Sequence, residues 1–233
     1  MKQRLRQNHD WVFDLDNTLY PPESDVFSQI DRRMTLYVAR LLGVPPEQAR
    51  KKQKAWYAEH GTTLSGLMIE HEVEPEHYLD FVHDIDLSSL SMDLALRAAI
   101  AALPGRKIVF TNGSRSHARR VTTACGLEGV FETMVGIEDT GFAPKPHPDA
   151  YDYLLKTVKV NPDRAAFIED MERNLKPAHA LGFITILVHS GKDWSDEPEG
   201  ARPAAAGDIY DHVHFTTGDL TGFLQQAIKP EKL

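Results

Sequence analysis

The chain of 233 residues carries 26 Lys and Arg against 34 Asp and Glu, a formal charge of −8, and 42% of its residues are hydrophobic. This composition is typical of a globular protein with a packed core, and the negative charge argues against nucleic-acid polymers and anionic membranes as partners. No apolar run approaches the roughly 20 residues of a membrane-spanning helix. The basic start leads directly into a strand-like segment, and the single cysteine, Cys125, cannot form an internal disulfide, so we expect a cytoplasmic protein.

The first half of the chain is predicted to be helical after one strand. The apolar run 11–14 predicts a buried strand that ends in a carboxylate. From residue 25, apolar residues recur every three and four positions, which predicts an amphipathic helix that ends at Gly43. Further helices are predicted over residues 46–60, 63–71, 75–84 and 92–103. No strand is expected between residues 22 and 103.

The second half alternates short apolar segments with helical ones. Strands are predicted over residues 107–110, 134–137, 165–168, 184–188 and 212–215. Helices are predicted over residues 116–125, 148–158, 173–181 and 220–228. This alternation indicates crossover units and a parallel sheet covered on both faces. The fold class is therefore α/β, with an all-helical cap inserted after the first strand. We expect the core to comprise residues 1–20 and 100–233, and the cap residues 21–99.

Four of the predicted strands lead into reactive side chains at their carboxyl ends, where ligands bind in open α/β sheets. The first leads into 14–19 (DLDNTL) and the second into 111–113 (TNG). Lys145 follows the third strand after a short loop, and Glu169 and Asp170 end the fourth. Unrelated surface residues would not gather at one sheet edge four times, so the set predicts a functional site.

Asp14 and Asp16 lie two positions apart, where the chain leaves the first strand. Two acids so placed can divide the work of hydrolysis. One attacks as a nucleophile, while the other gives a proton to the leaving group and then takes one from water. An isolated D-x-D is more often a turn with two solvated aspartates. The pair indicates a catalytic site only together with the other three segments.

Thr111, Asn112 and the backbone N–H groups near Gly113 offer hydrogen-bond donors at a strand-to-helix junction, which suits phosphate oxygens. Lys145 lies between two prolines that restrict its backbone, and it can neutralise both a carboxylate nucleophile and a phosphate. Taken singly, the first feature is as typical of an ordinary capping turn as of a phosphate site, and a single lysine is more often a surface residue in a turn.

Glu169 and Asp170 add acids to an edge that already holds two aspartates. Three or four carboxylates in one cleft repel one another strongly unless a cation lies among them. Oxygen ligands favour Mg²⁺, which also bridges to substrate phosphate. The sequence therefore predicts a Mg²⁺ site.

The four segments, in this order, resemble the motifs of the haloacid dehalogenase superfamily over about residues 10–190. The segments 14–21 (DLDNTLYP) and 174–178 (NLKPA) are most similar to the pyrimidine 5′-nucleotidase group. The resemblance implies a Rossmann-like core with a helical cap. It also implies a Mg²⁺-dependent phosphomonoester hydrolase that forms an aspartyl-phosphate, with a pyrimidine nucleoside 5′-monophosphate as the favoured substrate.

The same resemblance implies roles for single positions. Asp14 would be the nucleophile and Asp16 the general acid and base. Thr111 and Asn112 would bind the phosphoryl group, and Lys145 would hold the charges of the nucleophile and the phosphate.

The implied metal ligands are Asp170, Asp14 and the carbonyl of Asp16. The sequence departs from the family pattern at Glu169, where many relatives carry Asp, and this longer acid is a candidate second ligand, direct or through water. Met171 also replaces the usual small polar residue, so the local loop is not fixed by the resemblance.

Contacts to the rest of the substrate are expected near the cap, because the cap must close over the site. The candidates are Asn17, Tyr20, Arg32, Arg33 and His60. The basic run 50–54 (RKKQK) is typical of a solvated helix face and would meet substrate only if that face turned inward. The 11 histidines scatter along the chain, and none is assigned a role.

Several alternatives share these residues. A sugar-phosphate phosphatase or phosphomutase would use the same catalytic set. A dehalogenase needs neither the metal nor Asp16. An aspartate-phosphorylated signalling module has no use for the long helical insertion, and a catalytically dead phosphate-binding module would lack a motif residue. The expected partner is a small phosphomonoester, and the sequence leaves a homo-oligomer open.

Overall fold

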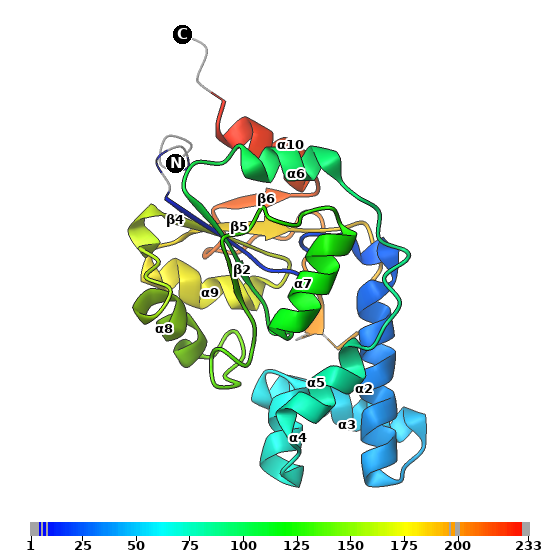
Figure 1. Ribbon diagram of the computed structural model, residues 1–233. Coiled ribbons are helices and arrows are strands. Elements are labelled where there is room, and N and C mark those ends of the chain that lie inside the picture. Colours follow the sequence, from blue (N-terminus) through cyan, green and yellow to red (C-terminus); the bar gives the residue numbers. More distant parts are fainter. Residues whose placement is uncertain (1–4, 6, 8, 196, 199–200, 230–233) are drawn as a thin grey trace.

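The computed structural model describes residues 5, 7, 9–195, 197–198 and 201–229. Its centre is a six-stranded sheet in the order β3-β2-β1-β4-β5-β6, in which every neighbouring pair runs parallel (Figure 1). The strands are β1 (Asp10–Phe13), β2 (Arg106–Phe110), β3 (Thr133–Val135), β4 (Ala165–Glu169), β5 (Ile184–Val188) and β6 (Phe215–Thr217). The predicted α/β class with a Rossmann-like parallel sheet is confirmed.

Helices cover both faces of this sheet. Successive strand residues point to opposite sides, and apolar residues on both sides need to be buried. In β1, Trp11 and Phe13 pack into one buried cluster and Val12 into the other. The first face is covered by α6 (Leu94–Ala101), α7 (Arg115–Ala124) and α10 (Leu220–Ala227). The second face is covered by α8 (Pro148–Lys156) and α9 (Glu172–Leu181). Burial on both faces explains why the inner strands read as continuous apolar runs.

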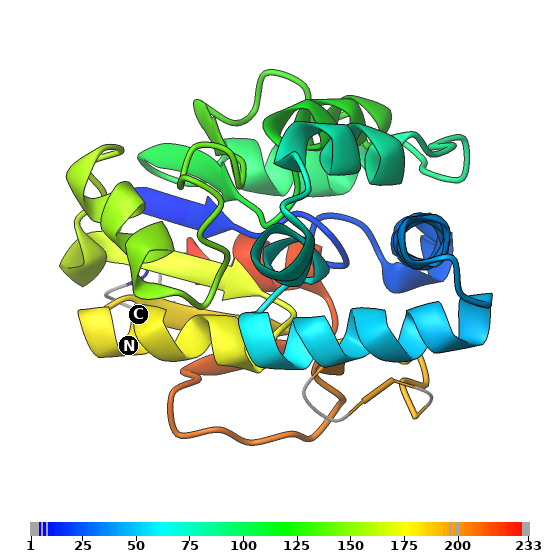
Figure 2. The same cartoon turned by 90° about the horizontal axis from the view of Figure 1, so that it is seen from below.

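Five α-helices lie between β1 and β2. Four of them precede α6 and follow the short 3₁₀ turn η1 (Pro22–Ser24). They are α2 (Val26–Leu42), α3 (Pro46–His60), α4 (Thr63–His71) and α5 (Pro75–His83). Helix α2 packs against α3 and α5, and α3 packs against α4. Figures 1 and 2 show these helices as a separate body beside the sheet. We call residues 22–83 the cap. The boundary expected at residue 99 falls inside α6, which packs against α10.

The sequence explains where the cap helices begin and end. Helix α2 buries Val26, Ile30 and Val38 along one stripe and ends at Gly43, whose φ of 63° suits a residue without a side chain. Pro46 opens α3 at a position where a missing N–H is harmless. Thr62 caps α4 by accepting a hydrogen bond from the Ser65 N–H at 3.1 Å.

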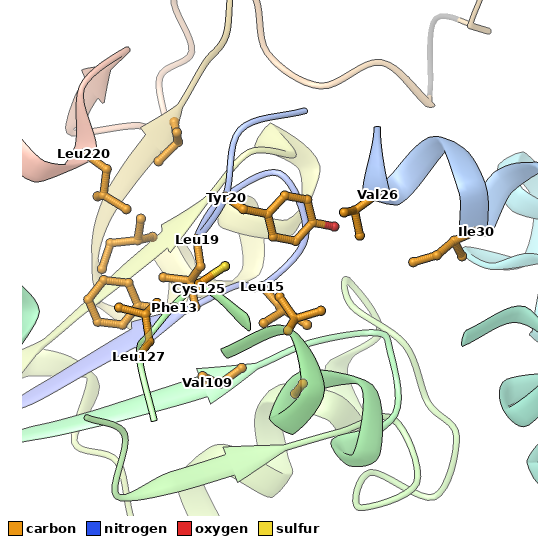
Figure 3. Close-up of a cluster of buried hydrophobic side chains, with 14 of the residues drawn as sticks. Phe13, Leu15, Leu19, Tyr20, Val26, Ile30, Val109, Cys125, Leu127 and Leu220 are labelled. Carbon is orange, nitrogen blue, oxygen red and sulfur yellow. The ribbon is translucent and has the colours of Figure 1, made fainter. Parts of the chain in front are cut away.

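An unbroken apolar cluster joins the sheet to the cap. It runs from the end of β1, through the turn that follows, to the first turns of α2 (Figure 3). Its members along this path are Phe13, Leu15, Leu19, Tyr20, Val26 and Ile30. The turn that carries the aspartates is therefore fixed from below by packing, which holds its polar side chains toward the cap.

The predicted helices and strands agree with the structure to within a few residues, except at the last strand. It was predicted over residues 212–215, but β6 comprises Phe215–Thr217. Before the ladder begins, the chain bonds Thr185 of β5 through side chains as well as backbone. The Thr185 hydroxyl donates to the His212 carbonyl at 2.7 Å, the Thr185 N–H donates to Nδ1 of His214 at 3.1 Å, and the His214 N–H donates to the Thr185 carbonyl at 3.1 Å. Alternation alone does not distinguish such contacts from strand pairing.

Two kinds of element were not expected from the sequence: a strand between residues 22 and 103, and a membrane-spanning helix. Among the described residues, no strand lies between residues 22 and 103, as predicted. None of the described helices, over the whole chain, has the length and apolar character needed to cross a bilayer.

Candidate active site

Strands β1, β2 and β4 are neighbours in the parallel sheet, so the segments that follow them meet at one edge. Asp14, Thr111 and Asp170 follow these three strands, and all three line one cavity of about 420 Å³. The remaining walls come from cap helices and from core residues at positions 192–194, 197, 201 and 203. The structure therefore brings the predicted motif segments to a single cavity between sheet and cap.

Lys145 is the buried cation at the floor of this cavity, with a relative exposure of 1%. Its Nζ donates to Asp14 Oδ1 at 2.6 Å, to Glu169 Oε1 at 2.8 Å and to the Phe110 carbonyl at 2.8 Å. These bonds satisfy all three ammonium hydrogens. Burial alone would lower the pKa of Lys145, but the carboxylates of Asp14 and Glu169 raise it above its ordinary value. The lysine is therefore a fixed positive charge.

Asn112 holds the backbone of Lys145 from the neighbouring strand end. Its amide nitrogen donates to the Lys145 carbonyl at 3.0 Å, and its amide oxygen accepts from the Lys145 N–H at 2.7 Å. The adjacent Thr111 hydroxyl accepts the Gly113 N–H at 2.9 Å. Because a hydroxyl can accept and donate at once, its hydrogen can still bind another oxygen in the cavity.

Three buried carboxylates converge beside this lysine. Oxygen atoms of Asp14, Glu169 and Asp170 all lie within 4.8 Å of one another. Glu169 accepts from Lys145 and from the Asn174 amide at 2.6 Å through Oε1, and from the Met171 N–H at 2.8 Å through Oε2. Burial alone would raise the pKa of Glu169, but these donors lower it. Glu169 is thus held as an anion.

The pKa values of Asp14 and Asp170 shift in the opposite direction from that of Glu169. Burial, the charge of Glu169 and the charge of Asp16 raise the pKa of Asp14 from 3.8 to about 8, against the opposing effect of Lys145. Burial, Glu169 and Asp14 also raise the pKa of Asp170 well above its ordinary value. One lysine does not balance this group of acids.

The donor set of this cluster fits a hard divalent cation. It consists of carboxylate oxygens, as Mg²⁺ prefers. In addition, Oδ1 of Asn174 is a buried acceptor in the same cavity with no hydrogen-bond partner among the described residues. Excess negative charge and an unsatisfied acceptor are both relieved by a cation or by its bound water.

Asp16 lies apart from these acids, on the wall of the cavity. Its Oδ1 accepts from the Tyr20 hydroxyl at 2.6 Å and is 3.0 Å from Nε2 of His117. Burial alone would raise the pKa of Asp16, but His117 and Tyr20 lower it below its ordinary value. The ring of His117 stacks on His83 of the cap, with centroids 4.2 Å apart and planes 8° from parallel.

Sequence reasoning missed this histidine pair. A signal for His117 exists, because it stands in the first turn of the helix that follows the TNG segment, and Ser114 caps that turn through the His117 N–H. No local pattern points to His83, which meets His117 only through tertiary packing. Tyr20, expected at the substrate, is bound to Asp16.

The family described as haloacid dehalogenase-like hydrolase matches residues 12–182 of the chain. The chain belongs to this hydrolase family. The matched range begins in β1 and ends just after α9, so it includes all four predicted segments and the cap.

Individual relatives agree with this assignment. Phosphate metabolism protein 8 of Saccharomyces cerevisiae is 26% identical over 206 residues, which are 81% of this chain and 64% of that protein, so the chain spans less than two thirds of its length. Glyceraldehyde 3-phosphate phosphatase of Methanocaldococcus jannaschii is 23% identical over 209 residues, 78% of this chain and 85% of that protein. CbbY from Rhodobacter sphaeroides, solved in complex with phosphate, has a TM-score of 0.60 at 16% identity and covers 90% of this chain and 93% of its own. The last likeness concerns the fold.

In this member of the hydrolase family, two of the residues expected near the cap line the cavity. They are Asn17, in the turn after β1, and Arg32, on α2. Oδ1 of Asn17 is buried without a partner among the described residues. Arg33 lies instead against Asp84, just after α5, and His60 lies near Glu70 on α4.

The basic run on α3 differs from the expected solvated face. Arg50 and Lys54 turn inward and line the cavity, while Lys51 stays exposed. Arg50 bonds Asp31 at 2.5 Å and Glu197 at 2.7 Å, and Lys54 lies 2.8 Å from each of the same acids. Two cations facing two anions give this far end of the cavity a polar but neutral wall, which ties the cap to the core segment that carries Glu197.

Proposed function

We propose that the protein is a Mg²⁺-dependent phosphomonoester hydrolase that forms a phosphoryl-enzyme intermediate on Asp14. The observation that carries the proposal is the buried contact of Asp14 with Lys145, beside Asp170, at the floor of one cavity. Membership in the hydrolase family and the phosphatase name of a relative that matches most of its length also support a phosphatase.

Phosphoryl transfer depends mainly on positioning and on neutralising charge. A phosphomonoester brings nearly two negative charges to a nucleophile that is itself an anion. Lys145 lies 2.6 Å from Asp14 Oδ1 and offsets part of this repulsion. The Thr111 hydroxyl is placed to donate to a phosphoryl oxygen, and the Asn112 side chain acts by holding Lys145 in place.

Asp14, Asp170 and the carbonyl of Asp16 would hold the cation. Bound Mg²⁺ would supply positive charge to the phosphoryl oxygens and keep Asp14 ionised. Both oxygens of Glu169 already accept hydrogen bonds, so we assign this acid to fixing Lys145. A direct role of Glu169 on the metal would require it to give up one of these bonds.

The chemistry then takes two displacements at phosphorus. In the first, Asp14 forms a bond to phosphorus as the ester P–O bond breaks. Asp16, which takes up a proton beside the negative charge of the bound substrate, gives that proton to the departing oxygen. In the second, water attacks phosphorus and passes a proton to Asp16, and the bond between Asp14 and phosphorus breaks. The enzyme returns to its starting state with inorganic phosphate and an alcohol as products.

For the substrate, we favour a pyrimidine nucleoside 5′-monophosphate. A cavity of about 420 Å³ suits a leaving group of that size, and its wall offers hydrogen-bonding groups and the side chains of Tyr57 and Trp194. The M. jannaschii relative, named for glyceraldehyde 3-phosphate, favours a second candidate, a sugar-phosphate phosphatase. A phosphomutase would use the same catalytic residues but would keep the phosphate on the sugar.

A phosphate-release assay tests the proposal. A panel of nucleoside monophosphates and sugar phosphates is incubated with the purified protein, with Mg²⁺ or with a chelator. We expect release from at least one substrate, and loss of that release with the chelator. Isomerised sugar phosphate without free phosphate would favour the mutase. Release that is indifferent to the chelator would contradict the metal-dependent mechanism.

A further inference from the structure

Two histidines outside the predicted motifs connect the cap to Asp16. His117 stands in the first turn of α7, on the core, and His83 is the last residue of α5, in the cap. Both are buried, with relative exposures of 1% and 7%. Their rings stack face to face at 4.2 Å, so the contact crosses the boundary between the two bodies.

The contacts of His117 define what its ring can do. Nε2 lies 3.0 Å from Asp16 Oδ1, and a carboxylate can only accept, so Nε2 carries the hydrogen. Nδ1 is buried with no hydrogen-bond partner among the described residues. Among the described contacts, the ring therefore makes one directed hydrogen bond, which Nε2–H donates to Asp16.

His83 is itself held against α7. Its Nδ1 lies 3.1 Å from the hydroxyl of Ser114, which also caps the helix turn that carries His117. Arg120 donates to the His83 carbonyl at 2.6 Å and to the Ile85 carbonyl at 2.9 Å. The end of α5 is thus clamped to α7, and the His83 ring closes one face of the His117 ring.

We propose that His117 is a positioning residue that orients the Asp16 carboxylate. We also propose that His83, a cap residue, holds the His117 ring in place by stacking on it. The inference rests on the proposed function, because it concerns the acid–base step of that reaction. Tyr20 and His117 both donate to Oδ1, which fixes the rotation of the carboxylate and leaves Oδ2 for proton transfer. The cap thereby contributes to catalysis through Asp16 as well as by covering the substrate.

The consequence differs between substrates. An alkyl phosphate needs a proton on its leaving oxygen, so a disordered Asp16 slows the first displacement. A p-nitrophenyl phosphate has a leaving group that departs without a proton, so only its second displacement, the attack of water, is slowed. With that substrate, loss of His117 causes the phosphoryl-enzyme to accumulate. A general loss of folding would lower both reactions alike and would trap no intermediate.

The test compares three variants of His117 in the full chain. Glutamine places its amide nitrogen where Nε2 stands, asparagine places it nearer Nδ1, and leucine removes the donor. For an alkyl phosphate we expect His117→Leu and His117→Asn to lower kcat by about 100-fold with KM within about threefold, and His117→Gln to recover to within about tenfold of the parent. Acid-quenched protein is assayed for phosphate trapped from p-nitrophenyl phosphate, which we expect to rise in His117→Leu.

A second pair of variants tests the cap. His83→Phe keeps a flat ring over His117, and His83→Ala removes it, so kcat is expected to fall further in the alanine variant. His71→Leu, an exposed substitution on cap helix α4, is the matched control, with kcat at the parent value.

Equal kcat in the parent and His117→Leu would overturn the inference, as would equal losses in all three His117 variants without trapped phosphate. If His117→Leu does not fold, the comparison of His117→Gln with His117→Asn still tests the inference. Equal activity of these two variants would also overturn the inference. Failure of the proposed function looks different, because the parent protein would then release no phosphate and trap no intermediate.

Discussion

Asp14 at the floor of the cavity and Asp16 on its wall stand two residues apart, yet their surroundings act in opposite directions. Asp14 lies among other acids, and burial and these charges raise its pKa to about 8 in the absence of a metal ion. Asp16 accepts from Tyr20 and His117, which lower its pKa. Two chemically identical side chains thus differ through their neighbours. The roles proposed for them need an ionised Asp14 and a protonated Asp16, which the charges of the cation and of the bound phosphate would impose.

The largest expected effect comes from the floor. Asp14→Asn keeps the shape of the side chain and removes the nucleophile, so we expect phosphatase activity to fall by about 10⁴-fold or more. The melting temperature should stay close to that of the parent, because asparagine has the size of the protonated acid and, like it, carries no charge. Asp152→Asn, an exposed change on α8, is the control. Activity of Asp14→Asn at the parent rate would assign the chemistry to another residue.

Lys145→Met tests the buried cation at the floor of the cavity. It leaves Asp14 and Glu169 without their buried cation, and breaking such a pair costs about 3–5 kcal/mol of unfolding free energy. We expect that loss in urea denaturation, together with loss of phosphate release. Stability equal to that of the parent would mean that the lysine does not hold Glu169 as an anion.

The pH dependence of stability follows from the same cluster. The folded-state pKa of Asp14 (about 8) lies above its unfolded value of 3.8, so the folded state binds this proton more tightly. The contribution of this group is therefore present at low pH and is lost as the pH rises from about 4 to about 8. A divalent cation replaces the proton. We expect saturating Mg²⁺ to raise the melting temperature by about 5 °C near pH 8 and by less near pH 5.

Differential scanning fluorimetry with Mg²⁺ and with a chelator, at both pH values, measures this shift. Asp170→Asn removes one of the acids assigned to the cation and should abolish most of the response. An equal or larger shift at the lower pH would contradict the role given to the carboxylate cluster.

The smallest effect is expected at the neutral wall of the cavity. Arg50→Met breaks the contacts to Asp31 and Glu197, which are partly exposed, so the loss of stability should stay below about 1 kcal/mol. Because this wall faces the leaving group and not the phosphate, we expect KM to rise by about threefold with little change in kcat. Steady-state kinetics on the preferred substrate measure both constants. A large fall in kcat would contradict this prediction and would mean that Arg50 takes part in the chemical steps.

Much of the fold could be predicted from the sequence because its signals are local. The apolar runs of the inner strands and the stripe of α2 gave both the type and the limits of these elements. Asp14, Thr111, Lys145 and Asp170 could be placed together because parallel strands end at one edge. The last strand was misplaced because His212 and His214 alternate like strand residues, while their bonds to Thr185 use its hydroxyl and the His214 ring as well as the backbone.

The remaining features depend on contacts that no local pattern records. His117 meets Asp16 across 101 positions of the chain, and it meets His83 through the packing of two helices. The inward turn of Arg50 depends on how α3 is rotated about its axis, which its charged composition does not fix. The use of Glu169 as a support for Lys145 is visible only when both side chains are placed.

The most direct test is to find the phosphoryl group itself. The parent protein is mixed with its substrate and Mg²⁺ and quenched in acid within the first turnovers, and its peptides are analysed by mass spectrometry. We predict a phosphoryl group on the peptide that contains Asp14, and its absence from that peptide in Asp14→Asn. Steady turnover with an unmodified Asp14 peptide, or with the phosphoryl group on another residue, would contradict the account.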